Sequence, residues 1–208
     1  MNVQRRQWLR GGMLVGGVLL SCALWAAEPS PEAVIRQTAE EVIATVKADK
    51  SIQAGDRNKA YALINQKVLP HFDFARMTRL AMGRNWNQAT GDQQKVIADD
   101  FKDLLVRTYS SSLSQYKDQV LQVKGSEVQA SEGEAVVHTV LVPSGGQNIP
   151  IDYSMEQQGN DWKVYDIKVD GVSLVTNYRG EFSDIVRRNG IDGLIQALEQ
   201  KRKAAQSK

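Results

Sequence analysis

The residues that could support metal or nucleophilic chemistry are few and widely spaced. The only two histidines, His71 and His138, lie far apart in the chain, and neither has the spacing of a metal-ligand pair. His71 follows Pro70 at an expected helix boundary, where a capping role is the simpler interpretation. His138 is expected on the solvent side of a strand. The sequence contains no phosphate-binding loop and no Gly-x-Ser-x-Gly motif.

Two carboxylates offer the strongest case for an enzyme. Asp152 and Asp166 fall on neighbouring predicted strands, and an acid held inside an apolar cone could shuttle a proton, as in cone-shaped α+β isomerases. Both, however, alternate with the apolar residues of their strands, so we expect solvated carboxylates. The sequence therefore predicts a protein that is not an enzyme and needs no metal or cofactor. An isomerase-like enzyme and a protein-docking scaffold remain the alternatives.

Composition sets limits on fold and partners. The chain has 208 residues, of which 42% are hydrophobic and 24% charged, which is enough for a real core and excludes a disordered chain. Lys and Arg number 26 against 24 Asp and Glu. Because three arginines lie in the first ten residues, which we expect to be removed, the remaining chain is nearly neutral. Such a chain is not expected to bind nucleic acid.

The first 27 residues have the pattern of an export signal. A basic stretch precedes the apolar run 11–25, and Ala26-Ala27 follow that run, so residues 1–27 are expected to be cleaved and 28–208 to form a single domain in the periplasm. Arg5-Arg6 resembles a twin-arginine signal, and Cys22 lies in a loose lipoprotein box. Cys22 is the only cysteine. A chain cleaved after it has no disulfide and no thiol chemistry.

The front half predicts helices. Ser30 is a suitable N-cap for a helix that runs from Pro31 past Val46, with apolar residues at helical spacing. Further helices are expected from Asp56 to Pro70 and from Asp73 to Met82. The longest is expected over about 91–115, where Thr90 and Gln93 have capping-box spacing.

The back half predicts strands followed by two helices. Strands are expected at 120–123, 128–130, 135–142, 148–156 and 162–169, separated by glycines such as Gly125. Val164 is placed on the face opposite Tyr165 and Ile167. Two helices are expected after Gly171, with a break at Asn189-Gly190. The order of elements predicts an α+β fold in which helices pack on one face of a curved, mainly antiparallel sheet.

Several motifs carry a resemblance to a known family. They cover the chain from about Pro31 to Leu198, and their joint order is more specific than any one of them. The motifs are Val68-Leu69-Pro70-His71-Phe72-Asp73-Phe74, Met77-Thr78-Arg79-Leu80, Gly83-Arg84-Asn85-Trp86, Trp162-Lys163-Val164-Tyr165-Asp166-Ile167, Gly171-Val172-Ser173-Leu174-Val175, Asn177-Tyr178-Arg179 and Gly190-Ile191-Asp192-Gly193-Leu194. In these residues the chain resembles the soluble periplasmic phospholipid carriers of the Mla pathway, also called toluene-tolerance proteins.

The resemblance implies a function. Such a protein shuttles phospholipid between an outer-membrane lipoprotein-porin complex and an inner-membrane ABC-type transporter that carries a ring of lipid-binding domains. It thereby maintains the lipid asymmetry of the outer membrane. The acyl chains would lie inside the protein and the headgroup outside, with no metal and no catalysed reaction.

The physics of this task predicts an enclosed pocket. Each buried methylene contributes about 0.8 kcal/mol, so one long acyl chain needs shielding worth roughly 12 kcal/mol. We expect a cavity in the upper part of the range of about 300–1,000 Å³ found for ligand sites. The residues expected to line it are Leu80, Met82, Trp86, Leu105, Tyr109, Leu113, Ile151, Tyr153, Met155, Tyr165, Ile167, Val172, Leu174, Val175 and Tyr178. Ordinary core packing is the alternative for each of them.

Basic residues are expected to matter only for docking. Arg76, Arg79 and Arg84 could form a basic rim near the mouth of the cavity, and Arg187, Arg188 and residues 201–203 another at the far end. A solvated helix face is the alternative interpretation of both groups.

Overall fold

The structure is a computed structural model that describes residues 30–114, 119–129, 131–143 and 145–206. The expected export signal, 1–27, lies outside the described residues. Within these ranges, every helix is either too short or too polar to cross a bilayer.

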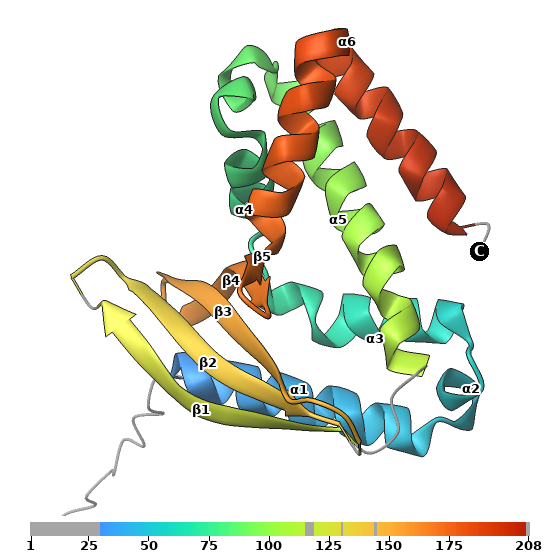
Figure 1. The fold of residues 1–208 in the computed structure, drawn as a ribbon, viewed down its shortest axis with the longest axis vertical. Coiled ribbons are helices and arrows are strands. Elements are labelled where there is room, and N and C mark those ends of the chain that lie inside the picture. Colours follow the sequence, from blue (N-terminus) through green and yellow to red (C-terminus); the bar gives the residue numbers. More distant parts are fainter. Residues whose placement is uncertain (1–29, 115–118, 130, 144, 207–208) are drawn as a thin grey trace, which may run out of the picture.

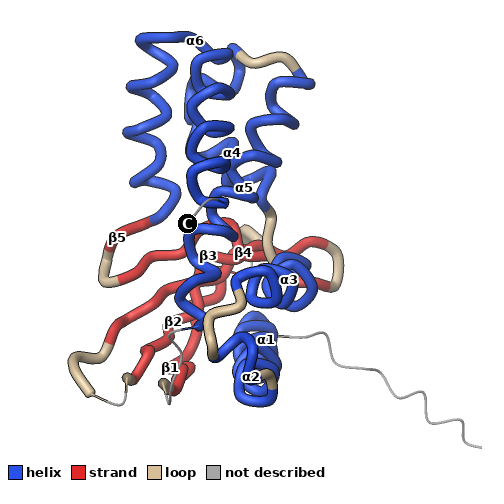
Figure 2. The backbone as a smooth tube through the Cα atoms, turned by 90° about the vertical axis from the view of Figure 1, so that its right-hand side faces the viewer, coloured by secondary structure: helices blue, strands red, loops and turns tan. Residues whose placement is uncertain are grey.

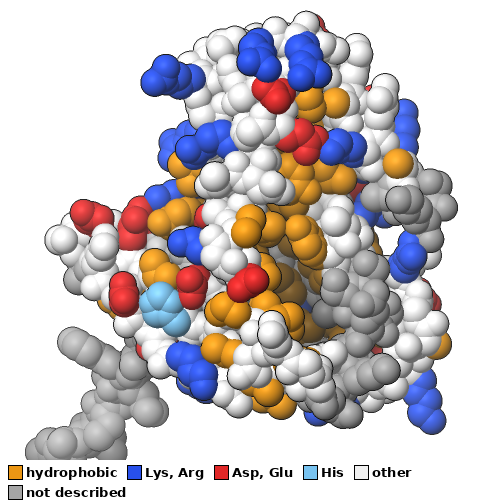
Figure 3. Space-filling model, in the orientation of Figure 1, with side chains coloured by type: hydrophobic (Ala, Val, Ile, Leu, Met, Phe, Trp, Pro, Cys, Tyr) orange, Lys and Arg blue, Asp and Glu red, His pale blue; other side chains and the backbone are white. Residues whose placement is uncertain are grey.

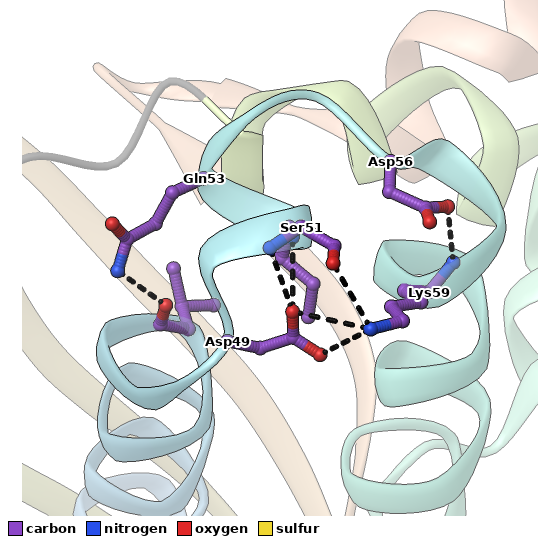
Figure 4. A network of polar contacts seen from close by, with 7 residues as sticks. Asp49, Ser51, Gln53, Asp56 and Lys59 are labelled. Carbon is purple, nitrogen blue, oxygen red and sulfur yellow. Dashed lines mark hydrogen bonds and ion pairs between the residues drawn. The ribbon is translucent and has the colours of Figure 1, made fainter.

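The chain begins with three helices that turn back on themselves. Helix α1 (Pro31–Ala48) is capped as expected, because the Ser30 hydroxyl accepts a hydrogen bond from Ala33 N at 3.1 Å. Helix α3 (Arg57–Lys67) is capped by Asp56. A short helix, α2 (Lys50–Gln53), lies between them and was not predicted. Its cap, Asp49, also binds Lys59 Nζ at 3.0 Å, so one carboxylate fixes the turn between α1 and α3 (Figure 4).

The next segment leads to the longest uninterrupted helix. A 3₁₀ turn, η1 (Leu69–His71), precedes α4 (Phe74–Met82), and a second, η2 (Gly83–Gln88), precedes α5 (Gly91–Ser114). The capping box predicted for α5 is confirmed. Thr90 N donates to Gln93 Oε1 at 2.9 Å, and Gln93 N donates to Thr90 Oγ1 at 3.3 Å.

Five antiparallel strands follow and form one open, curved sheet in chain order. They are β1 (Val120–Gln129), β2 (Glu134–Val142), β3 (Ile149–Gln158), β4 (Asp161–Val169) and the two-residue β5 (Val172–Ser173). The predicted α+β class and antiparallel pairing are confirmed. The short connections between the strands explain the simple order, since none is long enough for a crossover helix.

Two β-bulges make the observed strands differ from the predicted ones. The expected strands 120–123 and 128–130 are one strand, β1, in which Gly125 lies beside a register shift with φ 146°. A glycine accepts such a backbone angle without steric cost, so here it marks a bulge and not a turn. In β4, Asp166 pairs with Ser154 of β3 and Val164 pairs with Met155, so Tyr165 between them has no partner in β3. The placement of Val164 opposite the apolar face was therefore wrong: its side chain is fully buried.

The chain closes with α6 (Leu174–Gln206), which is two helical arms joined at a kink. Gly190 forms this kink with φ 72° and ψ −173°, which confirms the predicted break after Asn189. The helix was expected directly after Gly171, but Val172 and Ser173 form β5 and the helix begins at Leu174. The two-residue strand hydrogen-bonds to the end of β4, and no sequence period reveals so short a pairing.

Three apolar clusters hold the described part of the chain together: a helical core, a sheet core, and a smaller cluster of Val42, Val46, Ile52, Ala60 and Leu63 from α1, α2 and α3. Figures 1 and 2 show α4, α5 and α6 together at one end of the molecule, and the sheet with α1 along it at the other. The helical core comprises Met77, Ala81, Met82, Ala89, Ile97, Phe101, Leu104, Leu105, Val175, Phe182, Val186, Leu194 and Leu198. The sheet core comprises Val34, Ile35, Ala135, Val137, Met155, Trp162 and Val164.

Candidate functional site

An apolar pocket lies between α1, the segment around η1 and the inner face of the sheet. Its volume is about 230 Å³, smaller than the cavity expected from the sequence. Four of its residues come from α1, three from the segment around η1 and four from strands. The lining residues are Ile35, Thr38, Ala39, Val42, Val68, His71, Phe72, Leu121, Tyr153, Val164 and Ile167.

Three polar side chains interrupt this apolar lining. The Thr38 hydroxyl oxygen is buried and makes no hydrogen bond. Burial lowers the pKa of His71, and the nearby Lys163 lowers it further, so the imidazole is neutral at neutral pH. Burial raises the pKa of Tyr153 to about 12, which keeps the phenol neutral. A pocket lined in this way carries no charge of its own.

A hollow strip of hydrophobic side chains is open to solvent on one face of the molecule. Figure 3 shows it in the middle of the visible face, between the sheet and the helices above it. On the sheet, Val169 pairs with both Ile151 and Val172, and Val172 is 61% exposed. Contiguous exposed apolar surface of this kind is typical of binding sites.

The structure brings four of the predicted lining residues together on the sheet. Tyr153 and Ile167 line the pocket. Met155 is fully buried beside them in the sheet core. Ile151 is half-buried on the same strand face, where it pairs with Thr139 and Val169. Tyr153 and Ile167 thus contribute to the sheet side of the pocket, and Ile151 and Met155 share the strand face of Tyr153 by the alternation of β3.

A second group of predicted residues lies in or against the helical core. Met82, Leu105 and Val175 are buried there. Four more are partly buried against it: Leu80, Trp86, Tyr165 and Tyr178. The Tyr178 ring lies 4.8 Å from Phe101, edge to face, and burial together with the nearby Tyr109 raises its pKa to about 12. Sequence reasoning did not separate this cluster from the pocket.

The remaining predicted residues lie toward solvent or outside the described part. Tyr109 is 45% exposed, on the second half of α5. Leu174 is half-buried at the start of α6. The side chain of Leu113 lies outside the described residues.

Of the acid and histidine candidates, His71 lines the pocket, and the other three lie outside it or serve local structure. His138 Nδ1 and Asp152 Oδ1 are 2.8 Å apart on the outer sheet face, and both side chains are about one third exposed. Asp166 accepts hydrogen bonds from Ser173 Oγ at 2.6 Å and Val175 N at 3.1 Å, so it caps the start of α6. No cluster of three acidic, histidine or cysteine side chains among the described residues could hold a metal ion.

Arg76 does not belong to the basic rim expected for it. Its guanidinium bridges Glu134 and Glu156 on neighbouring strands and lies 3.6 Å from the centre of the Tyr165 ring. The hydrogen bond from Arg76 lowers the pKa of Glu134. Arg76 therefore joins α4 to the sheet by a bidentate, stacked contact.

The sequence analysis did not predict that α1 contributes to the lining of the pocket. Ile35, Ala39 and Val42 have helical spacing and were interpreted only as a packing stripe. The signal that could have identified a pocket is the size of the residues at its centre. Thr38 and Ala39 are small, and one of them is polar, within an otherwise apolar stripe.

Comparisons with known proteins agree on one family. Residues 36–200 match the family model described as MlaC protein. The chain is 29% identical to the toluene tolerance protein ttg2D of Pseudomonas putida, over 88% of this chain and 85% of that protein. It is 22% identical to the intermembrane phospholipid transport system binding protein MlaC of Haemophilus influenzae, over 95% and 94% of the two chains.

A solved structure adds a comparison of folds. It is a phospholipid-binding protein from Ralstonia solanacearum in complex with a phospholipid. The TM-score is 0.78 and the sequence identity 36%, and the match covers 84% of this chain and 97% of that one.

Proposed function

The chain belongs to the MlaC family, and from this premise we propose that it is a periplasmic phospholipid carrier. It sequesters acyl chains and shuttles lipid between an outer-membrane lipoprotein-porin complex and an inner-membrane ABC-type transporter with a ring of lipid-binding domains. In this proposal residues 1–27 are a cleaved export signal, 28–208 form the lipid-binding domain, and the protein catalyses no reaction. The observation that carries the proposal is the likeness to a structure solved with a phospholipid bound.

The pocket and the hollow strip provide the chemistry that such a carrier needs. A carrier must keep hydrocarbon from water, and the free energy of that shielding grows by about 0.8 kcal/mol per methylene. The pocket of about 230 Å³ is too small for a whole diacyl lipid, so we assign it the end of a chain. The rest of the lipid would follow the hollow strip seen in Figure 3, with the headgroup in solvent.

The residues in contact with lipid would then fall into two sets. On the sheet, Tyr153 and Ile167 line the pocket and Ile151 and Met155 lie beside them, and we assign Tyr109, Val172, Leu174, Val175 and Tyr178 to the part of the lipid that leaves the pocket. Leu80, Met82, Trp86, Leu105, Tyr165 and Leu113 remain in the proposal as the helical side of the site. The neutral tyrosines would place an apolar ring against the lipid and a polar tip toward its glycerol region.

Organic extraction of the protein purified from the periplasm, followed by mass spectrometry of the extract, tests the proposal. We expect co-purified phospholipid in the wild type. Ala39→Phe fills the pocket from α1 and should lower the lipid content per protein. Tyr109→Glu places charge beside hydrocarbon at a position exposed enough to tolerate it and should do the same.

A matched control comes from the same helix. Ala44 is exposed on α1, so Ala44→Phe adds the same volume outside the pocket and should retain the wild-type lipid content. A wild-type protein that is folded and contains no lipid would contradict the carrier proposal and favour a docking scaffold. Equal lipid content in the wild type, Ala39→Phe and Tyr109→Glu would show that the lipid lies elsewhere.

A further inference from the structure

A basic groove lies in the helical part of the molecule, where the end of α4 and η2 meet the first arm of α6. Its volume is about 400 Å³, and its lining residues are Met82, Gly83, Arg84, Asn85, Arg179 and Ser183. Helix α6 packs against both α4 and η2 at this place (Figure 1). The groove shares no residue with the pocket lined by α1 and the sheet.

Arg179 is held in the groove by the end of α4. Its Nε donates a hydrogen bond to the Leu80 carbonyl at 2.9 Å, one of the last carbonyls of that helix, which have no partner within it. This contact uses one N–H and leaves the two terminal NH₂ groups of the guanidinium for another acceptor. The side chain is thus already ordered before any ligand arrives, which reduces the entropy lost on binding.

Neither arginine of the groove has a carboxylate partner among the described residues. Each of four other arginines forms an ion pair with Asp or Glu: Arg76, Arg107, Arg187 and Arg202. Arg84 and Arg179 line one groove with no acidic residue in its lining. Two like charges on one concave surface repel each other, so an anion between them is favoured.

The other polar groups of the groove are also suited to an oxyanion. The Asn85 side-chain oxygen already accepts a hydrogen bond from Gln88 Nε2 at 3.0 Å, so its NH₂ group is the free end. Ser183 adds a hydroxyl. Guanidinium, amide NH₂ and hydroxyl groups all donate hydrogen bonds, and a carboxylate or phosphate accepts several at once.

The surroundings of the groove favour a protein over a bilayer. Surfaces that bind membranes combine basic residues with exposed apolar side chains that enter the lipid. Among the described residues, the exposed large hydrophobic side chains all lie outside the groove: Val96, Tyr109, Val120, Val128, Ile149, Val169 and Val172. A concave site also suits a side chain that projects from a partner's surface better than a flat layer of headgroups.

We propose that this groove is a docking site for a carboxylate side chain on the acidic surface of a protein partner. The proposal rests on the proposed function only in that a carrier must meet protein complexes to load and unload. In this docking, Arg179 and Arg84 bind the carboxylate of the partner in a bidentate manner, and Asn85 and Ser183 donate further hydrogen bonds to it.

Titration of the ¹⁵N-labelled protein, purified from the periplasm, with hexaglutamate at low salt tests this site. We expect shift changes at the amides of Gly83, Arg84 and Asn85 and at Arg179 Nε–H, and weaker binding at high salt. Arg84→Glu/Arg179→Glu should weaken the binding by about tenfold or more. Arg84→Lys/Arg179→Lys keeps the charge and loses the planar fork, and should weaken it by about threefold.

The control reverses two charges elsewhere on α6. Arg187→Glu/Arg188→Glu changes the net charge equally outside the groove and should alter the affinity less than about twofold. The docking site would be overturned if both charge reversals weakened hexaglutamate binding equally. It would also be overturned if hexaglutamate changed no chemical shift at the groove. Binding to phosphatidylglycerol vesicles that depends on Arg84 and Arg179 when hexaglutamate does not bind would overturn it as well. Lipid extracted from the same samples reports on the carrier function separately, so failure of one proposal is distinguishable from failure of the other.

Discussion

The helical core and the sheet core are both apolar, yet aromatic rings fill the centre of the first, whereas the second borders an apolar pocket. In the helical core the Phe101 ring lies 5.1 Å from Phe182 and 4.8 Å from Tyr178, and both pairs meet edge to face. These rings fill the space between α5 and α6. In the sheet core, Ile35 and Val164 lie at the wall of a pocket of about 230 Å³.

The two cores differ in the size of the side chains at their centres. Large aromatic residues lie at the centre of the helical core, whereas Thr38 and Ala39 lie on α1 where the helix faces the sheet. Interiors close to crystal density leave few voids larger than a water molecule. A small residue opposite a curved sheet is therefore a means of keeping space open, at some loss of packing energy.

The comparison predicts that truncating a residue has different costs in the two regions. Leu194 is fully buried in the helical core, so Leu194→Ala should lower the free energy of unfolding by about 4 kcal/mol. Ile35 is nearly as buried but faces the pocket, so Ile35→Ala should cost about 2 kcal/mol, because its side chain has fewer packing partners to lose. Urea denaturation of delipidated protein measures both.

A matched surface variant sets the baseline for these two values. Val96 is exposed on α5, and Val96→Ala should change the free energy of unfolding by less than about 0.5 kcal/mol. Equal costs for Leu194→Ala and Ile35→Ala would mean that the pocket wall packs as tightly as the helical core.

Arg76 connects the two regions, and its removal is the next largest expected effect. Its guanidinium side chain is 18% exposed and neutralises Glu134 and Glu156, which are paired on neighbouring strands. Arg76→Met leaves two carboxylates side by side and should lower the free energy of unfolding by about 2 kcal/mol. Chemical denaturation at pH 7 provides the measurement.

The lysine variant separates charge from geometry at this position. Arg76→Lys retains the cation but cannot bridge two carboxylates in a fork or stack as well on Tyr165, so its stability should fall between wild type and Arg76→Met. A lysine variant as stable as the wild type would show that charge alone joins α4 to the sheet.

The contact between Arg76 and Glu134 also predicts that the stability of the protein depends on pH. The hydrogen bond from Arg76 lowers the pKa of Glu134 below its ordinary value of 4.5, so the ionised form stabilises the folded state above that value. This contribution is lost as the pH falls from 4.5 through the folded-state pKa. The stability difference between wild type and Arg76→Met should therefore narrow below pH 4.5, as denaturation curves at several pH values would show. If the stability difference between wild type and Arg76→Met does not change with pH, Glu134 is not the carboxylate through which Arg76 stabilises the fold.

Much of the fold was predictable because the signals are local. Ser30 caps a helix as expected, the helices predicted to start at Asp56 and Asp73 begin directly after these residues, and the backbone angle of Gly190 breaks α6. The failures involve pairing between strands. A glycine at a bulge resembles a glycine at a turn in the sequence, and the extra residue at Tyr165 depends on the register of β3 against β4.

The site was less predictable than the fold, because lining a pocket and filling a core require the same residue types. Alternation placed Tyr153 and Ile167 correctly on the inner face of the sheet. No periodicity distinguishes Leu105, which is buried in the helical core, from a residue that faces a pocket. Arg76 was expected at a rim because its two carboxylate partners lie on distant segments, and their position depends on how the sheet meets α4.

The smallest expected effect tests the pocket wall itself. The Thr38 hydroxyl oxygen is buried at the pocket without a hydrogen-bond partner, and such a group costs about 1–3 kcal/mol when it replaces an apolar one of the same shape. Thr38→Val keeps the shape and removes the hydroxyl, so it should raise the free energy of unfolding by about 1 kcal/mol and leave the lipid content at least equal to that of wild type. Thr45 on the same helix donates to the Glu41 carbonyl at 2.8 Å, so Thr45→Val should bring no such gain. Loss of stability in Thr38→Val would mean that the hydroxyl has a partner when the protein is in solution, and that this side of the pocket is wet.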